Sequence, residues 1–286
     1  MFQRSHIVLA PQTRITLVTS VKPGRPLVYA HRGGAALRPE NTFAAFDHGL
    51  ALGADGLELD VRLSKDGVVV VHHDATLERT TDGRGLVADH SADGLARLDA
   101  GYRFQSSDAT LPFRGQGVTI PTLAAVLRRY PDIPIIIELK SELPGDGTEI
   151  ARRTVDVVRQ ADAVGRVALG SFSGRALRTV RLLEPALRTG AAREETRWAL
   201  YRSWVGWPLG RPRYQEFQVP ERAGATTVVT RRFVEHAHKY GLAVKVWTVD
   251  EESDMTRLLG WGVDGIISDR PDVAVTVVNA QALRRS

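Results

Sequence analysis

Short apolar runs alternate with helix-like segments from residue 27 to residue 268, and this alternation limits the fold more than any other feature. Such alternation predicts a parallel sheet, and eight strands predict a sheet that closes into a barrel. The eight expected strands are Leu27–His31, Gly56–Val61, Ile133–Leu139, Arg166–Ser171, Ala186–Ala191, Tyr214–Val219, Leu242–Thr248 and Gly265–Ser268. The expected helices between them include Thr122–Tyr130, Glu149–Ala161, Gly174–Leu183, Arg231–Tyr240 and Glu251–Leu259. We therefore expect an α/β fold, a (β/α)8 barrel.

The second expected strand continues into a predicted β-hairpin. Its turn contains Asp66-Gly67, a pair that favours a two-residue type I′ turn because both central residues need positive φ. In that register His73 lies across from Asp60, and Glu58 lies two residues along the same face. Two carboxylates and an imidazole on one face indicate a hard-cation site beside a titrating group. The alternative is the polar face of a half-exposed strand, which shows the same alternation.

Other polar side chains come at the ends of expected strands. His31 and Arg32 end the first strand just before a glycine pair, and Glu138 and Lys140 end the third. Active-site residues of barrels lie at the carboxyl ends of the strands, so we expect these groups to converge. Asn41, before the next helical stretch, is expected to serve as its N-cap.

Five motifs follow one another between about residues 27 and 272: HRGG…PENT, ELDV…DG-VVVVHHD…TLERTTDG, IELK, VWTVD and GVDGIISDRPD. In this order the chain resembles the glycerophosphodiester phosphodiesterase family. The resemblance implies a TIM-type barrel of the phospholipase C-like kind, with an insertion at about residues 75–119 that caps the active site. It also implies the site residues: catalytic His31 and His73, divalent-cation ligands Glu58, Asp60 and Glu138, phosphate-binding Arg32 and Lys140, and Trp247 against the glycerol.

The expected reaction is metal-dependent hydrolysis of a glycerophosphodiester to glycerol 3-phosphate and an alcohol. Three carboxylates without cysteine favour one Mg²⁺ or Ca²⁺ ion over zinc. By resemblance, His31 is the base and His73 the acid, and the nucleophile is water or the neighbouring glycerol hydroxyl. The alternatives are a lysophospholipase D-like phosphodiesterase, another metal-dependent barrel enzyme such as an isomerase or aldolase, and a phosphate-binding protein without turnover.

Composition limits the partners and the compartment. The net charge is +5, but the basic residues are dispersed, which argues against nucleic acid as a partner and favours a small anionic substrate. No apolar run is long enough to cross a membrane, and the N-terminus does not read as a signal peptide, so we expect a cytoplasmic protein. We expect residues 27–286 to form one catalytic domain, preceded by an extension of unknown role at residues 1–26. The oligomeric state is left open.

A tryptophan-rich run between Trp198 and Pro208 contains three of the five tryptophans. The first interpretation is a buried amphipathic helix. The second is a surface lip that makes transient contact with a membrane or a lysolipid chain. His72 is expected to point away from His73 and to be structural.

Overall fold

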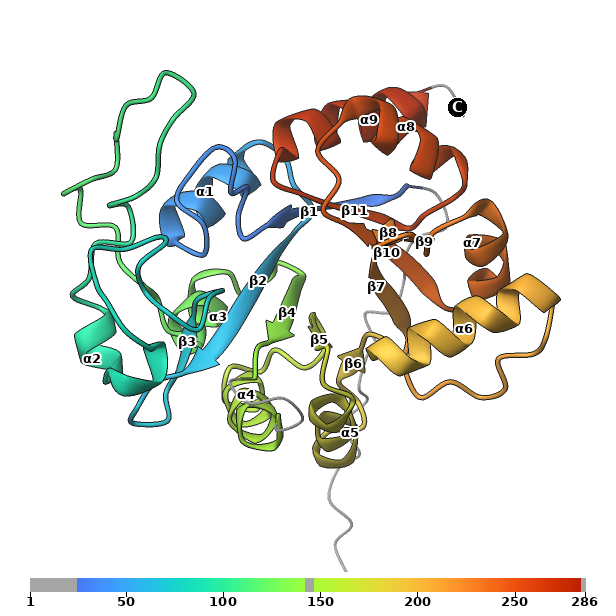
Figure 1. The fold of residues 1–286 in the computed structure, drawn as a ribbon, viewed down its shortest axis with the longest axis horizontal. Coiled ribbons are helices and arrows are strands. Elements are labelled where there is room, and N and C mark those ends of the chain that lie inside the picture. Colours follow the sequence, from blue (N-terminus) through green and yellow to red (C-terminus); the bar gives the residue numbers. More distant parts are fainter. Residues whose placement is uncertain (1–24, 142–146, 284–286) are drawn as a thin grey trace, which may run out of the picture.

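The protein is described from a computed structural model, which defines residues 25–141 and 147–283. At its centre lies a barrel of parallel strands surrounded by helices (Figure 1). The barrel strands are β1 (Leu27–His31), β2 (Gly56–Leu63), β4 (Ile135–Leu139), β5 (Val167–Gly170), β6 (Arg188–Thr189), β7 (Glu216–Pro220), β10 (Ala243–Trp247) and β11 (Gly265–Ser268). They are paired in the order β6-β5-β4-β2-β1-β11-β10-β7. The predicted α/β barrel fold is confirmed, with strand ends shifted by a few residues.

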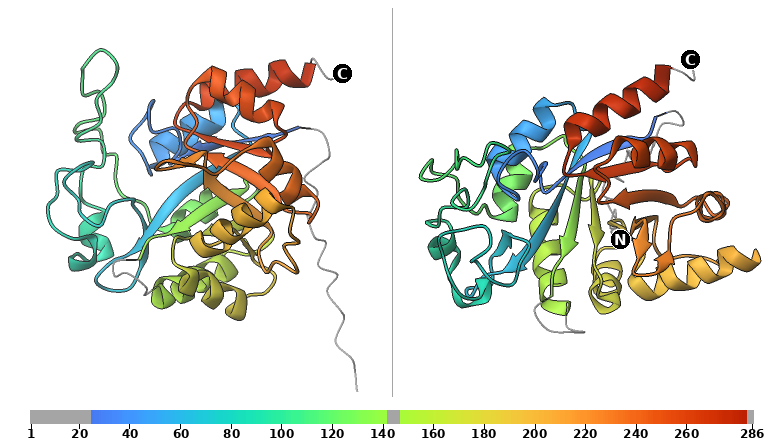
Figure 2. Two further views of the ribbon diagram at one scale, coloured as in Figure 1. Left: turned by 45° about the vertical axis from the view of Figure 1, so that its right-hand side comes forward. Right: turned by 45° about the horizontal axis from the view of Figure 1, so that its top comes forward.

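A helix follows each barrel strand and covers the outside of the barrel (Figure 2). Side-chain caps begin several of these helices. Thr42, Thr122, Ser173 and Thr230 each accept a hydrogen bond from a first-turn amide, which satisfies a donor that the helix itself cannot. The helices are α1 (Phe43–Ala51), α3 (Leu123–Arg129), α4 (Thr148–Gln160), α5 (Gly174–Leu183), α6 (Arg193–Val205), α7 (Arg231–His238), α8 (Glu252–Gly260) and α9 (Pro271–Leu283).

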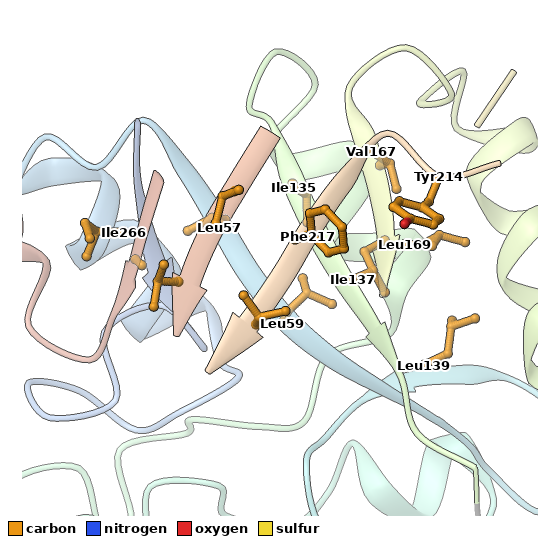
Figure 3. Packing of buried hydrophobic residues seen from close by; sticks show 14 of the residues in the cluster. Leu57, Leu59, Ile135, Ile137, Leu139, Val167, Leu169, Tyr214, Phe217 and Ile266 are labelled. Carbon is orange, nitrogen blue, oxygen red and sulfur yellow. The ribbon is translucent and has the colours of Figure 1, made fainter. Parts of the chain in front are cut away.

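Alternate residues of the strands face the helices and the barrel interior. On β2, Leu57 and Leu59 are fully buried in the main hydrophobic core, which strands and helices share (Figure 3). Their neighbours Glu58 and Asp60 point to the opposite face because side chains alternate along a strand. Glu138 on β4 pairs in register with Asp60. The two-residue period thus gathers carboxylates inside the barrel while leucines hold the strand against the helices.

The barrel closes between β6 and β7, where the pairing is shortest. Gly190 and Glu216 form an isolated parallel bridge. Two backbone hydrogen bonds accompany it, from Ala191 N to Glu216 O at 2.9 Å and from Gln215 N to Thr189 O at 3.1 Å. By comparison, β2 and β4 pair over five residues.

The hairpin forms, but its predicted register is wrong by one residue. Strand β3 (Val69–Val71) pairs with β2, and the backbone N–H of His72, not His73, donates to Asp60 O at 3.0 Å. The turn is longer than expected: Ser64 N bonds to Val68 O at 3.0 Å, which leaves three residues in the loop. Only the last of them, Gly67, has positive φ (76°). A three-residue loop with a left-handed glycine replaces the two-residue turn, and this shifts every cross-strand pair.

The insertion at residues 75–119 contains the short 3₁₀ helix η1 (Val87–Asp89) and α2 (Ala92–Leu95). Leu77, Val87, Leu95 and Ala100 of the insertion form a small hydrophobic core together with Val70 of β3 and Ile120. The insertion lies beside α1 and β3 (Figure 1). A second small hairpin, β8 (Arg222–Ala223) with β9 (Thr226–Thr227), follows β7 and was not predicted.

Helix α6 is not the buried helix of the first interpretation. Its buried residues are Ala199, Leu200 and Ser203, whereas Trp198 and Trp204 are exposed. The sequence pattern could not separate these cases, because aromatic residues at helical spacing occur in cores and on binding surfaces alike. Among residues 25–141 and 147–283, no helix combines the length and apolarity needed to cross a membrane. The expected N-terminal extension, residues 1–26, lies almost wholly outside the described residues.

Candidate active site

A cavity of about 580 Å³ opens at the carboxyl ends of the barrel strands. The cavity has two sides with different linings, one near β2 and one near β7. These two strands stand opposite each other in the closed strand order. Near β2 the lining is charged: His31, Arg32, Glu58, His73, Glu138 and Lys140. Toward β7 and α6 the lining is mainly apolar, although Arg193 and Arg197 of α6 also belong to it. The large apolar groups there are Phe172, Leu200, Tyr201, Trp204, Val219, Val228 and Trp247. No residue of the insertion at 75–119 lines this cavity.

Three carboxylates form the floor of the charged side. Glu58, Asp60 and Glu138 each offer an oxygen within 4.8 Å of the others. Burial and then the charge of Asp60 raise the pKa of Glu58 to about 8, and burial also raises the pKa of Glu138. Burial favours the protonated form of Asp60 too, but Lys140 and Arg32 outweigh it and hold the pKa of Asp60 below its usual value. Three acids so close together repel one another, so this floor is suited to a cation.

Two basic side chains stand at the triad. Lys140 Nζ lies 3.1 Å from Asp60 Oδ1 and 2.9 Å from Glu138 Oε1. Arg32 Nε lies 3.1 Å from Asp60 Oδ2, and its Nη1 donates to Glu40 Oε1 at 3.0 Å. Asp60 Oδ1 and Glu138 Oε1 are buried, and the Lys140 ammonium is the group that lies beside both of them. An all-oxygen set of this kind fits Mg²⁺ or Ca²⁺.

His31 and His73 both line the cavity, as predicted, and a carboxylate holds each ring. His31 Nδ1 lies 2.7 Å from Asp269 Oδ1, and His31 Nε2 lies 3.7 Å from Glu58 Oε2. Burial lowers the pKa of His31, but Glu58 and Asp269 outweigh it and leave this pKa raised. His73 Nδ1 lies 2.5 Å from Asp74 Oδ1, and burial is the main reason that the pKa of His73 is lowered.

His73 reaches the site although the hairpin register differs from the prediction, because it lies beyond the end of β3, where the strand pairing no longer sets its direction. His72 is buried, and its Nε2 lies 3.1 Å from Thr76 O. His72 was expected to point away from His73, and it does not line the cavity.

Some site residues were missed or misassigned from the sequence. Asn41 is not the N-cap of α1, since Thr42 fills that place. Asn41 instead has a left-handed backbone (φ 59°) and donates from Nδ2 to Asp60 Oδ2 at 3.0 Å. Asp269 follows directly on β11, and this position at a strand end was the signal that could have identified it. Arg79, from the insertion, donates to Asp74 Oδ2 at 2.5 Å and thereby braces the partner of His73.

Trp247 ends β10 and lines the cavity as predicted. Its ring meets that of Phe172 edge-on, with the centroids 6.0 Å apart. Together they form part of the apolar lining of the cavity.

Fold and site together define a barrel enzyme suited to an anionic phosphate ester, because cations and acid–base groups meet at one end of its cavity. Residues 31–273 match the glycerophosphoryl diester phosphodiesterase family. The chain belongs to this family, which decides against the isomerase and aldolase alternatives.

Individual relatives agree. A glycerophosphodiester phosphodiesterase of Caldanaerobacter subterraneus is 36% identical over 262 residues, which are 89% of this chain and 98% of that protein. The structure of an Oleispira antarctica phosphodiesterase in complex with the product sn-glycerol-3-phosphate is 27% identical, with a TM-score of 0.71, covering 89% of this chain and 97% of that one. A glycerophosphodiester phosphodiesterase of Agrobacterium tumefaciens is 29% identical, with a TM-score of 0.69, covering 88% and 99%.

Proposed function

We propose that the protein hydrolyses glycerophosphodiesters to glycerol 3-phosphate and an alcohol, using a divalent cation and two histidines. The carboxylate triad beside Arg32, Lys140 and the two histidines carries this proposal. Family membership supports it, as does the sn-glycerol-3-phosphate held by the Oleispira phosphodiesterase.

Glu58, Asp60 and Glu138 would hold the cation, either Mg²⁺ or Ca²⁺. When bound, it would neutralise charge on the phosphate and so favour attack on an anionic diester. Arg32 and Lys140 stand at the edge of the triad, where their N–H groups can donate to phosphate oxygens. Asn41 would act through Asp60 as a positioning residue, because its side-chain amide donates a hydrogen bond to Asp60 Oδ2 and so orients this carboxylate.

His31 and His73 would share the proton transfers, His31 as base toward the nucleophile and His73 as acid toward the leaving alcohol. Despite burial, Glu58 and Asp269 raise the pKa of His31, and burial lowers the pKa of His73, which is the opposite of what this assignment of base and acid favours. A cation on Glu58 would weaken the strongest influence that raises the pKa of His31.

A lysophospholipase D-like activity is the second candidate, and the apolar side of the cavity favours it. Leu200, Tyr201 and Val219 could contact an acyl chain that a soluble glycerophosphodiester lacks. Comparison of lysophosphatidylcholine with glycerophosphocholine at equal enzyme concentration ranks the two substrate classes directly.

The decisive experiment measures glycerol 3-phosphate and free choline from glycerophosphocholine after EDTA treatment and again after Mg²⁺ or Ca²⁺ is restored. We expect EDTA to abolish turnover, the cation to restore it, and E58Q, D60N and E138Q to lose turnover by orders of magnitude while remaining folded. E149Q, on the exposed side of α4, is the matched control. Full turnover by rigorously metal-free protein would remove the cation from the reaction. A transient cyclic phosphate would identify the glycerol hydroxyl as the nucleophile.

A further inference from the structure

Five large apolar side chains on and just after α6 are exposed beside the mouth of the cavity. We call them the aromatic patch: Trp198, Tyr201, Trp204, Val205 and Trp207. Trp198, Trp204 and Trp207 are 60%, 47% and 65% exposed. The ring centroids of Trp198 and Tyr201 lie 6.2 Å apart, and those of Tyr201 and Trp204 lie 5.2 Å apart. Contiguous apolar surface of this kind on a soluble domain marks an interaction site.

The local structure holds the patch outward. Figure 2 shows α6 reaching away from the barrel toward its C-terminal end. The helix ends at Gly206, whose left-handed backbone (φ 70°) turns the chain so that Trp207 N bonds to Arg202 O at 2.9 Å. This turn keeps Trp207 beside the last turn of α6 and exposed to solvent.

A bound substrate cannot account for the whole patch. Tyr201 and Trp204 line the cavity, but Trp198, Val205 and Trp207 do not. A molecule inside the cavity would contact only the first two. The other three need a partner that lies along the outer surface of the protein.

The charges around the patch identify that partner. Residues 193–213 contain five arginines and two glutamates, and one of these acids, Glu195, is already paired with Arg181 at 2.7 Å. Tryptophan and tyrosine beside arginine favour the headgroup region of a bilayer, where rings enter the interface and guanidinium groups meet lipid phosphates. A second copy of this chain fits less well, since a two-fold interface on α6 would place the net positive charge of residues 193–213 against the same charge on the other copy.

We propose that the aromatic patch docks the protein on a membrane surface that contains anionic phospholipids. Docking places the mouth of the cavity at the lipid surface, because Tyr201 and Trp204 belong to both the patch and the cavity. The benefit of this position rests on the proposed phosphodiesterase function, but binding itself requires no turnover. The two proposals can therefore fail separately.

The test is co-sedimentation of the full chain with vesicles of phosphatidylcholine alone or of phosphatidylcholine and phosphatidylglycerol in equal parts. We expect the protein to bind the anionic vesicles, to bind the neutral ones much less, and to be released by salt. The double variant W198A/W207A should bind at least about tenfold more weakly, a change of about 1.4 kcal/mol. Its kcat/KM on soluble glycerophosphocholine should stay within about twofold, since neither side chain lines the cavity.

L182A is the matched control, because Leu182 is 80% exposed on α5, away from the patch, and its loss should leave vesicle binding unchanged. Four results would each overturn the proposal. The wild-type protein could ignore both kinds of vesicle. W198A/W207A could bind like wild type. Sedimentation could show a wild-type dimer that W198A/W207A converts to a monomer, which would assign the patch to a second copy. Finally, W198A/W207A could lose turnover of soluble glycerophosphocholine and also melt at a lower temperature. That result would assign these tryptophans to the core and end the proposal.

Discussion

At the residue scale, each cavity histidine is oriented by a carboxylate. Asp269 holds Nδ1 of His31, and Asp74 holds Nδ1 of His73. A carboxylate at Nδ1 favours the tautomer with its proton there, which leaves Nε2 free to exchange a proton in the cavity. His72, the neighbour of His73 in the sequence, instead contacts the Thr76 carbonyl oxygen through Nε2 and does not line the cavity.

We therefore expect H73A to lower kcat/KM by about 10²–10⁴, the usual loss when an acid or base is removed. H72A should keep kcat/KM within several-fold and should lower the melting temperature instead, because His72 is buried and bonded to Thr76. Turnover of glycerophosphocholine and thermal melting of both variants separate the two effects. Similar losses of kcat/KM in H72A and H73A would contradict the assignment of a catalytic role to His73 and a structural role to His72.

The individual residues also show how far the sequence could predict the site. The two-residue strand period placed Glu58 and Asp60 on one face, and Glu138 was expected at a neighbouring strand end. Their grouping as three ligands of one cation came from the family resemblance. Asn41 could not be assigned correctly, since a capping asparagine and one that braces a carboxylate look the same in sequence. Its left-handed backbone, which turns the amide toward Asp60, is visible only in three dimensions.

At the element scale, strands and helices were predictable because buried runs and helical spacing repeat along the whole chain. The pattern could not predict the register of the β2–β3 hairpin or the exposed face of α6. One extra residue in the loop before Val68 shifted the hairpin, and nothing in the sequence of α6 indicated which face lacked a neighbour. Both depend on contacts between distant parts of the chain.

Helix α1 shows how closely one element supports the site. A Cβ added at Gly49 would lie 2.6 Å from Gly33 O, in the loop that follows His31 and Arg32. We expect G49A to displace this loop and to lower both the melting temperature and kcat/KM. G260A, in α8, is the matched control, because a Cβ there has open space. It should leave activity unchanged and stability equal or higher by about 0.5–1 kcal/mol. Wild-type turnover by G49A would show that α1 does not position the loop.

At the scale of the whole molecule, the acidic triad would couple the binding of an ion to folding. The carboxylates are assembled only in the barrel, so an ion that binds them stabilises the folded state. We expect Mg²⁺ or Ca²⁺ to raise the melting temperature, by an amount equivalent to about 2.7 kcal/mol at a hundredfold excess over Kd. E58Q should lose most of this increment. A melting temperature unaffected by either ion, in wild-type protein freed of metal, would argue that the triad binds neither.

Because the pairing between β6 and β7 is short, we expect this part of the barrel to open more readily than the pairing between β2 and β4. One backbone bridge, Gly190–Glu216, and its two flanking hydrogen bonds join the two strands, with side-chain contacts from Thr189 N to Gln215 Oε1 and from Arg188 to Glu216 beside them. By contrast, β2 and β4 are paired along five residues. We expect the amides of Ala191 and Gln215 to exchange with deuterium sooner than those of β2. Since α6 starts at this closure, its fluctuations would widen the apolar side of the cavity and leave the carboxylates in place. Substrates whose alcohol groups differ in size could then be accommodated on the apolar side of the cavity, while the phosphate binds beside carboxylates that do not move.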